Sequence, residues 1–436
     1  MNPPYLRSWA IGGAIALVVF VLGGLLVAAS GLVPLTASSG HWAVTEWLLQ
    51  FGKRRSVATH TLGMRELDLA PPWLVMKGAG HYESGCRPCH GGVDSPTPRI
   101  AAAMLPLPPH LPPRIEMWDP EELFYIVKHG IKFTGMPAWQ SQERDDEVLA
   151  LVAFLLAMPN MDSDVYRGLV YGGAPPDRAV VPLEDIPDAD RPPEPVTGSC
   201  ARCHGVHGLG RGSAAFPKLA GQQRDYLLGT LQAYASGDRN SGIMEPVAAG
   251  LSAAERSVLA DYYAALPADP DAAAADDTPE TPAPGTEPAA EPRTPPAAPP
   301  GTYPATVAQG EGAFAPTPGT WASPTGEGEG TSSAGSPDVS RGREIASRGV
   351  PDLGVPSCMD CHGPGTGPRN PMYPRLAGQY ADYLVLQLEL FKEQRRGGSP
   401  YAHIMHHVVD GLDQQQTHDV AFFYASLPAA ADSAAR

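Results

Sequence analysis

The sequence predicts an all-α protein built from three small units, and three observations support this prediction. The motif C-x-x-C-H occurs three times and uses every cysteine of the chain. Signals for helix starts and helix ends recur between the motifs, and no segment shows the polar–apolar alternation expected of a β-strand. The N-terminal region is one long apolar run, which predicts a separate helix outside the three units.

Each C-x-x-C-H motif is the attachment signature of a covalently bound c-type haem. The three motifs contain, in chain order, Cys86, Cys89 and His90; Cys200, Cys203 and His204; and Cys358, Cys361 and His362. Both thiols must reach the haem vinyl groups, and the imidazole must reach the iron, from one short turn. A structural zinc site needs four ligands and a dithiol redox pair needs no His, so these alternatives are disfavoured. We therefore expect three covalently bound haem c groups.

Residues 1–40 predict a membrane anchor or a signal peptide. No Asp, Glu, Lys or Arg occurs at positions 8–45, and residues 9–35 are almost entirely apolar. This run is long enough to span a bilayer as a helix and is longer than the core of a signal peptide, which favours an anchor. Small residues at positions 28–30 would suit a cleavage site, so a removed signal is the alternative.

Composition divides the remaining chain into three units and two linkers. Residues 268–338 are rich in Pro, Ala, Gly, Thr and Glu and nearly lack large aliphatic side chains, which predicts a disordered tether. This tether holds most of the formal net charge of −16, so the rest of the chain has little charge with which to attract partners. A second Pro-rich linker covers residues 169–195. The resulting units are unit one (68–168), unit two (196–267) and unit three (339–430).

Units two and three form an internal repeat. The run P-K-L-A-G-Q at residues 217–222 returns as P-R-L-A-G-Q at residues 374–379, and each run continues into a predicted helix. Both units end in Leu-Pro, at residues 266–267 and 427–428.

Capping residues predict where individual helices begin. The capping signals are Ser252 with Glu255, Asp413 with Gln416, and Asp119 followed by Pro120. In unit one we expect helices at residues 121–129 and 146–158. Units this short have little core of their own, so the haem is expected to form much of it.

A second axial ligand decides whether each iron transfers electrons or reacts with substrates. A Met opposite His raises the reduction potential and closes the iron. Unit one offers Met136 in the run T-G-M-P-A-W, unit two offers Met244, and unit three offers Met405 at the matching place, each expected in a loop before the last helix. The alternatives within the same units are Met104, Met117 and Met158 in unit one and Met372, His406 and His407 in unit three.

With these motifs the chain resembles a bacterial class I cytochrome c fused three times. Units two and three resemble the domains of dihaem cytochrome c4 in the C-x-x-C-H-G motif, the P-x-L-A-G-Q run, the G-L-S or G-L-D helix start and the closing L-P. Unit one resembles single-haem domains of membrane-bound cytochromes that serve oxidases or dehydrogenases. The resemblance implies three cytochrome c-like haem domains in tandem, plus one N-terminal transmembrane helix and a disordered linker. It also implies crossed terminal helices and the ligand pairs His90/Met136, His204/Met244 and His362/Met405.

Two departures from cytochrome c4 change what we expect. A short linker joins the two domains of cytochrome c4, whereas the tether here predicts a mobile unit three whose haem is not fixed beside that of unit two. Unit two is preceded by a Pro-rich stretch at residues 191–195, so its N-terminal helix is expected to be short or supplied by a neighbouring unit.

The resemblance also predicts the location of the chain. Haem of this type is attached outside the bacterial cytoplasm, so we expect an anchor in the bacterial inner membrane and haem domains in the periplasm. The positive-inside rule favours the reverse orientation, because Arg7 precedes the apolar run while Lys53, Arg54 and Arg55 follow it. The haem requirement outweighs that rule, and the juxtamembrane segment 41–67 is then expected to lie at the lipid headgroups.

Electron transfer is the expected function, without catalytic residues, a small-molecule substrate or nucleic acid. We expect a membrane-anchored carrier between a quinol-oxidising complex or dehydrogenase and a terminal oxidase. The alternative is the cytochrome subunit of a membrane-bound alcohol or sugar dehydrogenase. An enzyme such as a peroxidase or a thiosulfate-oxidising cytochrome would need an open iron or a Cys ligand, whereas each unit offers a Met and no Cys is left over.

Overall fold

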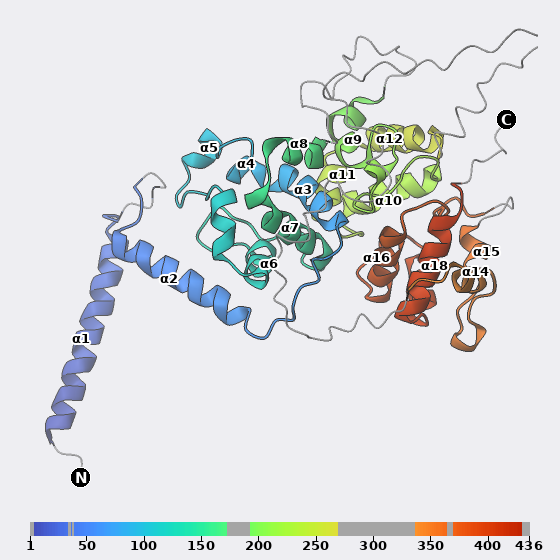
Figure 1. Ribbon diagram of the computed structural model, residues 1–436. Coiled ribbons are helices and arrows are strands. Elements are labelled where there is room, and N and C mark those ends of the chain that lie inside the picture. The colour runs from blue at the N-terminus through green and yellow to red at the C-terminus, as the bar shows by residue number, and fades with distance from the viewer. Residues whose placement is uncertain are drawn as a thin grey trace, which may run out of the picture.

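The computed structural model describes residues 4–33, 36, 39–171, 192–268, 336–363 and 369–429. Over these ranges the chain is helical and contains no strand, only two isolated bridges, which confirms the predicted all-α class (Figure 1). The predicted tether lies almost entirely outside the described residues, as does most of the linker before unit two.

Two helices precede the haem units. Helix α1 (Pro4–Ala29) includes an apolar stretch, Ser8–Ala29, with a mean hydropathy of 2.6 and no buried residue, as in a membrane span or a signal sequence. Helix α2 (Ala43–His60) runs from the end of α1 toward unit one (Figure 1), where His60 stacks on Tyr125 with ring centroids 5.3 Å apart.

Unit one consists of longer helices joined by short turns. The longer helices are α3 (Trp73–Gly85), α6 (Pro120–His129), α7 (Asp145–Ala157) and α8 (Ser163–Tyr171). The shorter elements, apart from the attachment turn, are α5 (Arg99–Ala102), η1 (Pro112–Met117) and η2 (Met158–Asn160). A capping box between Asp119 and Glu122 begins α6, as the sequence predicts. Helix α7 begins and ends one residue earlier than predicted.

Three helices of unit two have counterparts in unit three. Unit two has η5 (Gly210–Gly212), α10 (Arg224–Ser236), α11 (Met244–Ala249) and α12 (Ala253–Ala265). Unit three has α14 (Val339–Arg348), η7 (Pro351–Leu353), α16 (Ala381–Lys392), α17 (Ala402–Asp410) and α18 (Gln414–Ser426). Helices α10, α11 and α12 of unit two correspond to α16, α17 and α18 of unit three. The predicted capping boxes are confirmed: the backbone N of Glu255 donates to Ser252 Oγ at 3.2 Å, and that of Gln416 donates to Asp413 Oδ1 at 2.8 Å.

In units one and three the first helix crosses the helix that follows the candidate axial methionine, and a glycine lies at each crossing. A Cβ atom on Gly78 of α3 would lie 2.0 Å from the carbonyl oxygen of Ala150 in α7. A Cβ atom on Gly342 of α14 would likewise lie 2.0 Å from the carbonyl oxygen of Asp419 in α18. The two backbones therefore touch, and the helix crossing implied by the resemblance is present in both units.

Replacing Gly342 with Ala should destabilise unit three. The added methyl group has to push α14 away from the α18 backbone, which we expect to cost about 1–3 kcal/mol of the free energy of unfolding. Denaturant unfolding of the haem-loaded chain measures this loss. The matched control is Gly52→Ala in α2, where a Cβ atom meets nothing within 4 Å. Equal stability of the two variants would contradict a close crossing.

Unit two receives part of its packing from unit one. Among residues 192–268, only the π-helical turn η4 (Val196–Cys200) precedes the second haem motif. Helix α3 of unit one packs against unit two, since a Cβ atom on its Gly80 would lie 2.9 Å from the ring of Phe216. Arg211 of unit two donates to the carbonyl oxygens of Gly168 and Leu169 at 2.8 and 2.7 Å and so caps α8.

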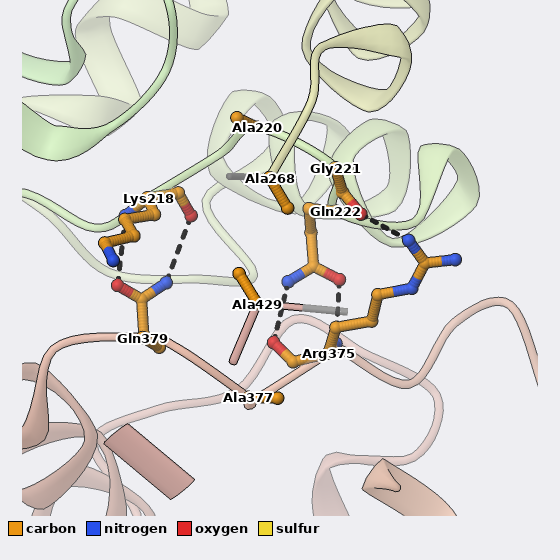
Figure 2. Close-up of a pocket in the computed structure, with 9 residues that line it drawn as sticks. All are labelled: Lys218, Ala220, Gly221, Gln222, Ala268, Arg375, Ala377, Gln379 and Ala429. Carbon is orange, nitrogen blue, oxygen red and sulfur yellow. Dashed lines mark hydrogen bonds between the residues drawn. The ribbon is translucent and has the colours of Figure 1, made fainter. Parts of the chain in front are cut away.

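Unit three is docked on unit two by a symmetric set of hydrogen bonds (Figure 2). The Gln222 amide donates to the carbonyl oxygen of Arg375 at 3.0 Å and accepts from its backbone N at 2.8 Å. The Gln379 amide makes the same two bonds to Lys218, both at 3.0 Å. These residues occupy equivalent places in the repeated P-x-L-A-G-Q run, so the contact has pseudo-two-fold symmetry. We call these two glutamines and the two backbone segments they bind the glutamine clasp.

Further bonds extend the clasp, and they show that the expected mobile unit three was wrong. The Lys218 ammonium donates to the Gly378 carbonyl oxygen at 2.7 Å, and the Tyr380 hydroxyl donates to the Leu209 carbonyl oxygen at 2.6 Å. A composition that predicts a disordered tether gives information only about the segment that joins the two units. Whether the units bind each other depends on their surfaces, which tether composition does not reveal.

Candidate haem sites

All three C-x-x-C-H motifs form the same single helical turn. These turns are α4 (Arg87–His90), α9 (Ala201–His204) and α15 (Met359–His362), each starting directly after the first cysteine of its motif. Each turn ends at a glycine of left-handed φ, namely Gly91 at 72°, Gly205 at 78° and Gly363 at 78°. A glycine adopts such a φ without steric cost, so the chain leaves the turn directly after the His. The six cysteines are free thiols and partly buried, as haem attachment requires.

A proline carbonyl orients each motif histidine. The Nδ1 atoms of His90, His204 and His362 donate to the carbonyl oxygens of Pro109, Pro217 and Pro374 at 2.8, 3.1 and 2.9 Å. Because Nδ1 carries the proton, the lone pair of Nε2 is free to bind a metal ion. Burial lowers the pKa of all three imidazoles, which favours this neutral form. These carbonyl partners could not be predicted from the sequence.

The attachment turns of units two and three line one shared cavity. His204 and Met244 lie on its unit-two side, and His362 and Met405 lie on its unit-three side. The four cysteines of these two motifs also line it. A covalently bound haem would place its vinyl edge at the thiols and its iron at the imidazole, and the cavity offers this set of donors twice.

Buried arginines on the cavity wall that lack a carboxylate partner within the described ranges support the fit to haem. Arg239 and Arg396, at equivalent places in the repeat, are 8% and 9% exposed, and neither forms an ion pair with a carboxylate among the described residues. A buried cation is costly unless an anion pairs with it. The buried hydroxyls of Tyr263 and Tyr424 likewise lack a hydrogen-bond partner in the described part of the chain. Haem propionates would supply the negative charge that the two arginines lack.

The candidate axial methionines precede α7 in unit one and the last helix in units two and three. Met244 is the first residue of α11, and Met405 lies within α17, so both belong to short helices and not to loops as predicted. Met136 does lie in a loop, between α6 and α7, where its backbone N donates to Thr134 Oγ1 at 3.0 Å.

The alternative ligands of unit three have other contacts. His406 Nε2 donates to the Arg396 carbonyl oxygen at 2.7 Å, and His407 is exposed. Neither histidine lines the shared cavity, whereas Met405 does. Met372 also lines it, but its methyl group points at Gly229 across the contact between the units.

In unit one, Met158 is 1% exposed and belongs to the hydrophobic core, and Met117 is exposed at the surface. The methyl group of Met104 meets Gly135, directly beside Met136. These placements disfavour Met158 and Met117, whereas Met104 lies beside Met136. The axial roles of Met136, Met244 and Met405 stay predictions.

Comparisons with known proteins identify two of the units. Residues 74–155 match the family model of cytochrome c oxidase, cbb3-type, subunit III, and residues 195–266 match that of cytochrome c. The thiosulfate dehydrogenase electron acceptor of Thiomonas intermedia is 30% identical over 240 residues, which cover 55% of this chain and 82% of the relative. The protein of the same name from Stutzerimonas stutzeri is 29% identical, with coverage of 53% and 81%. Cytochrome c4 of Thiocapsa roseopersicina is 28% identical, with coverage of 47% and 75%.

These relatives, which cover about half of this chain, support the haem attachment that the turns indicate. Cytochrome c domains hold haem c through the two thiols of the C-x-x-C-H motif, and the turns described above present those thiols together with a free imidazole nitrogen. The chain therefore belongs to the multihaem c-type cytochromes, with homology to cytochrome c4 and to the electron acceptors of thiosulfate dehydrogenase, and its function is electron transfer.

Proposed function

We propose that the chain is a membrane-anchored electron carrier with three haem c groups, one in each unit. Each unit combines an attachment turn with an oriented imidazole and a methionine farther along the chain. The proposed ligand pairs are His90 with Met136, His204 with Met244, and His362 with Met405. A His/Met iron has no open position for a substrate and has a raised reduction potential, which suits transfer between proteins and not substrate chemistry.

The proposed electron transfer takes place at the periplasmic face of the bacterial inner membrane, with α1 as the membrane anchor. The match of unit one to an oxidase subunit supports a terminal oxidase as acceptor. The names of the relatives support a periplasmic dehydrogenase as donor, and favour a thiosulfate dehydrogenase over an alcohol or sugar dehydrogenase or a quinol-oxidising complex. Gentle detergent purification, followed by identification of the co-purifying proteins, tests this choice of donor.

Absorption spectroscopy of the purified, haem-loaded chain tests the proposed ligation. We expect three haems per chain, and in the oxidised protein a weak near-infrared band characteristic of Met–iron ligation. The reduced protein should not bind CO rapidly, because each sixth position is already filled. Rapid CO binding at one haem per chain, or a near-infrared band too weak for three Met-ligated irons, would overturn the assignment of three closed irons.

A further inference from the structure

We propose that the contact between the Met136 loop of unit one and the Met244 segment of unit two carries electrons between these two units, with Trp139 as the bridging side chain. This inference rests on the proposed three-haem relay. The contact consists of Trp139 and Glu147 from unit one and Ser241 and Gly242 from unit two, and we call it the tryptophan junction.

The indole of Trp139 packs directly on the backbone of Gly242. A Cβ atom on Gly242 would lie 2.4 Å from Cε2 of Trp139 and 2.6 Å from its Nε1, so only glycine admits the ring at this distance. Trp139 follows Met136 by three residues, and Gly242 precedes Met244 by two. The two segments that carry the proposed axial ligands thus touch at the indole of Trp139.

Glu147 joins both sides of the junction with hydrogen bonds. Its carboxylate accepts from Trp139 Nε1 at 3.1 Å, from the backbone N of Gly242 at 2.7 Å and from Ser241 Oγ at 2.7 Å. Ser241 Oγ in turn accepts from the backbone N of Met244 at 3.1 Å. A continuous chain of hydrogen bonds therefore links the Trp139 indole to the residue proposed to bind the unit-two iron.

Buried charges hold the junction in place. Glu147 is 2% exposed and lies 3.3 Å from the Arg144 guanidinium, which also donates to the Asn240 carbonyl oxygen of unit two at 2.7 Å. Asp146 pairs with Lys77 at 2.7 Å and with Arg144 at 2.7 Å, and these two cations hold the pKa of its carboxyl far below the usual range. Every charge of this buried group has a partner of opposite sign, so the group fixes one geometry for the contact.

This geometry suits electron tunnelling. Tunnelling rates fall steeply across through-space gaps and much less along covalent and hydrogen bonds. The junction offers short covalent segments on both sides, joined by one van der Waals contact and by the hydrogen bonds of Glu147. It would carry one electron at a time, the iron of one unit being oxidised as that of the other is reduced, with no bond or proton exchanged.

The direct test measures electron redistribution in the full haem-loaded chain in detergent after rapid photochemical injection of one electron. With Trp139→Leu we expect the phase that equilibrates units one and two to slow by about tenfold or more, because the contact on which transfer depends is lost. Trp139→Phe keeps a ring on Gly242 and should restore most of the rate. Absorption spectra and midpoint potentials should not change in either variant, whereas a general loss of structure would alter both.

The matched control is Trp118→Leu, which removes a partly buried tryptophan that packs within the core of unit one. It should leave the rate unchanged. An unchanged rate in Trp139→Leu would overturn the junction, whereas absent redistribution in the unaltered chain would overturn the relay itself. If Trp139→Leu does not load haem, the same measurement is made on Gly242→Ala, because the added methyl group has to displace the Trp139 ring. Slowed electron redistribution in that variant would support the junction, and an unchanged rate would refute it.

Discussion

Replacing Met405 with Ala is expected to open the iron of unit three to CO and to lower its midpoint potential. Met405 and the oriented His362 both line the shared cavity, and thioether ligation raises a haem potential. We expect the potential to fall by on the order of 0.1 V, well within the range of about 0.8 V that axial ligands span. Redox titration measures the shift, CO binding to the reduced chain detects the open iron, and the near-infrared band should lose the contribution of one haem.

The controls for this experiment come from the same cavity and the same helix. Met372→Ala removes a second cavity-lining methionine and should leave CO binding and potential unchanged. His406→Ala should also be silent at the iron, because His406 Nε2 is bonded to a backbone carbonyl oxygen. CO binding in His406→Ala, together with none in Met405→Ala, would instead establish bis-His ligation.

The features that the sequence predicted correctly are local ones. One helical turn is enough to place two cysteines and a histidine together, so the motif alone specifies the geometry of each attachment turn. The caps at Ser252, Asp413 and Asp119 involve side chains within three residues of the backbone groups they bind. The glycine crossings and the proline carbonyls join residues distant in sequence and carry no comparable signal.

The residues that sequence reasoning missed serve contacts between units. Gln222 and Gln379 are part of the repeated run, which indicated the repeat but not that each glutamine binds the opposite unit. Arg239 and Arg396 also occupy the same position when the two repeats are aligned. This match is a sequence feature that could have indicated a shared cavity. The position of Glu147 did not indicate its role in the contact between units, because an acidic residue in the first turn of a helix ordinarily stabilises the helix through its dipole.

Removing both clasp amides, by Gln222→Ala together with Gln379→Ala, should release unit three from unit two. The clasp contributes four hydrogen bonds, each worth about 1 kcal/mol net. The expected loss is therefore at least about 4 kcal/mol, close to a thousandfold in the docking equilibrium. Small-angle scattering should show a larger radius of gyration, and the amides of Lys218 and Arg375 should exchange hydrogen faster.

The matched control replaces two exposed glutamines, Gln232 of unit two and Gln414 of unit three, with Ala. It removes the same number of amides from the same two units and should leave scattering and exchange unchanged. Because the tether still joins the units, released unit three stays nearby at a high effective concentration, so the variant should show a partly open population and not full separation.

The symmetry of the clasp makes the single variants informative. Gln222→Ala and Gln379→Ala break equivalent pairs of bonds and should weaken docking by similar amounts, and the double variant should cost more than their sum if the two halves support each other. Opening the contact would also expose the cavity that units two and three share, so the midpoint potentials of both haems should shift in the double variant. Unchanged scattering and exchange there would mean that the outer bonds, such as Tyr380 to Leu209, are enough to hold unit three in place.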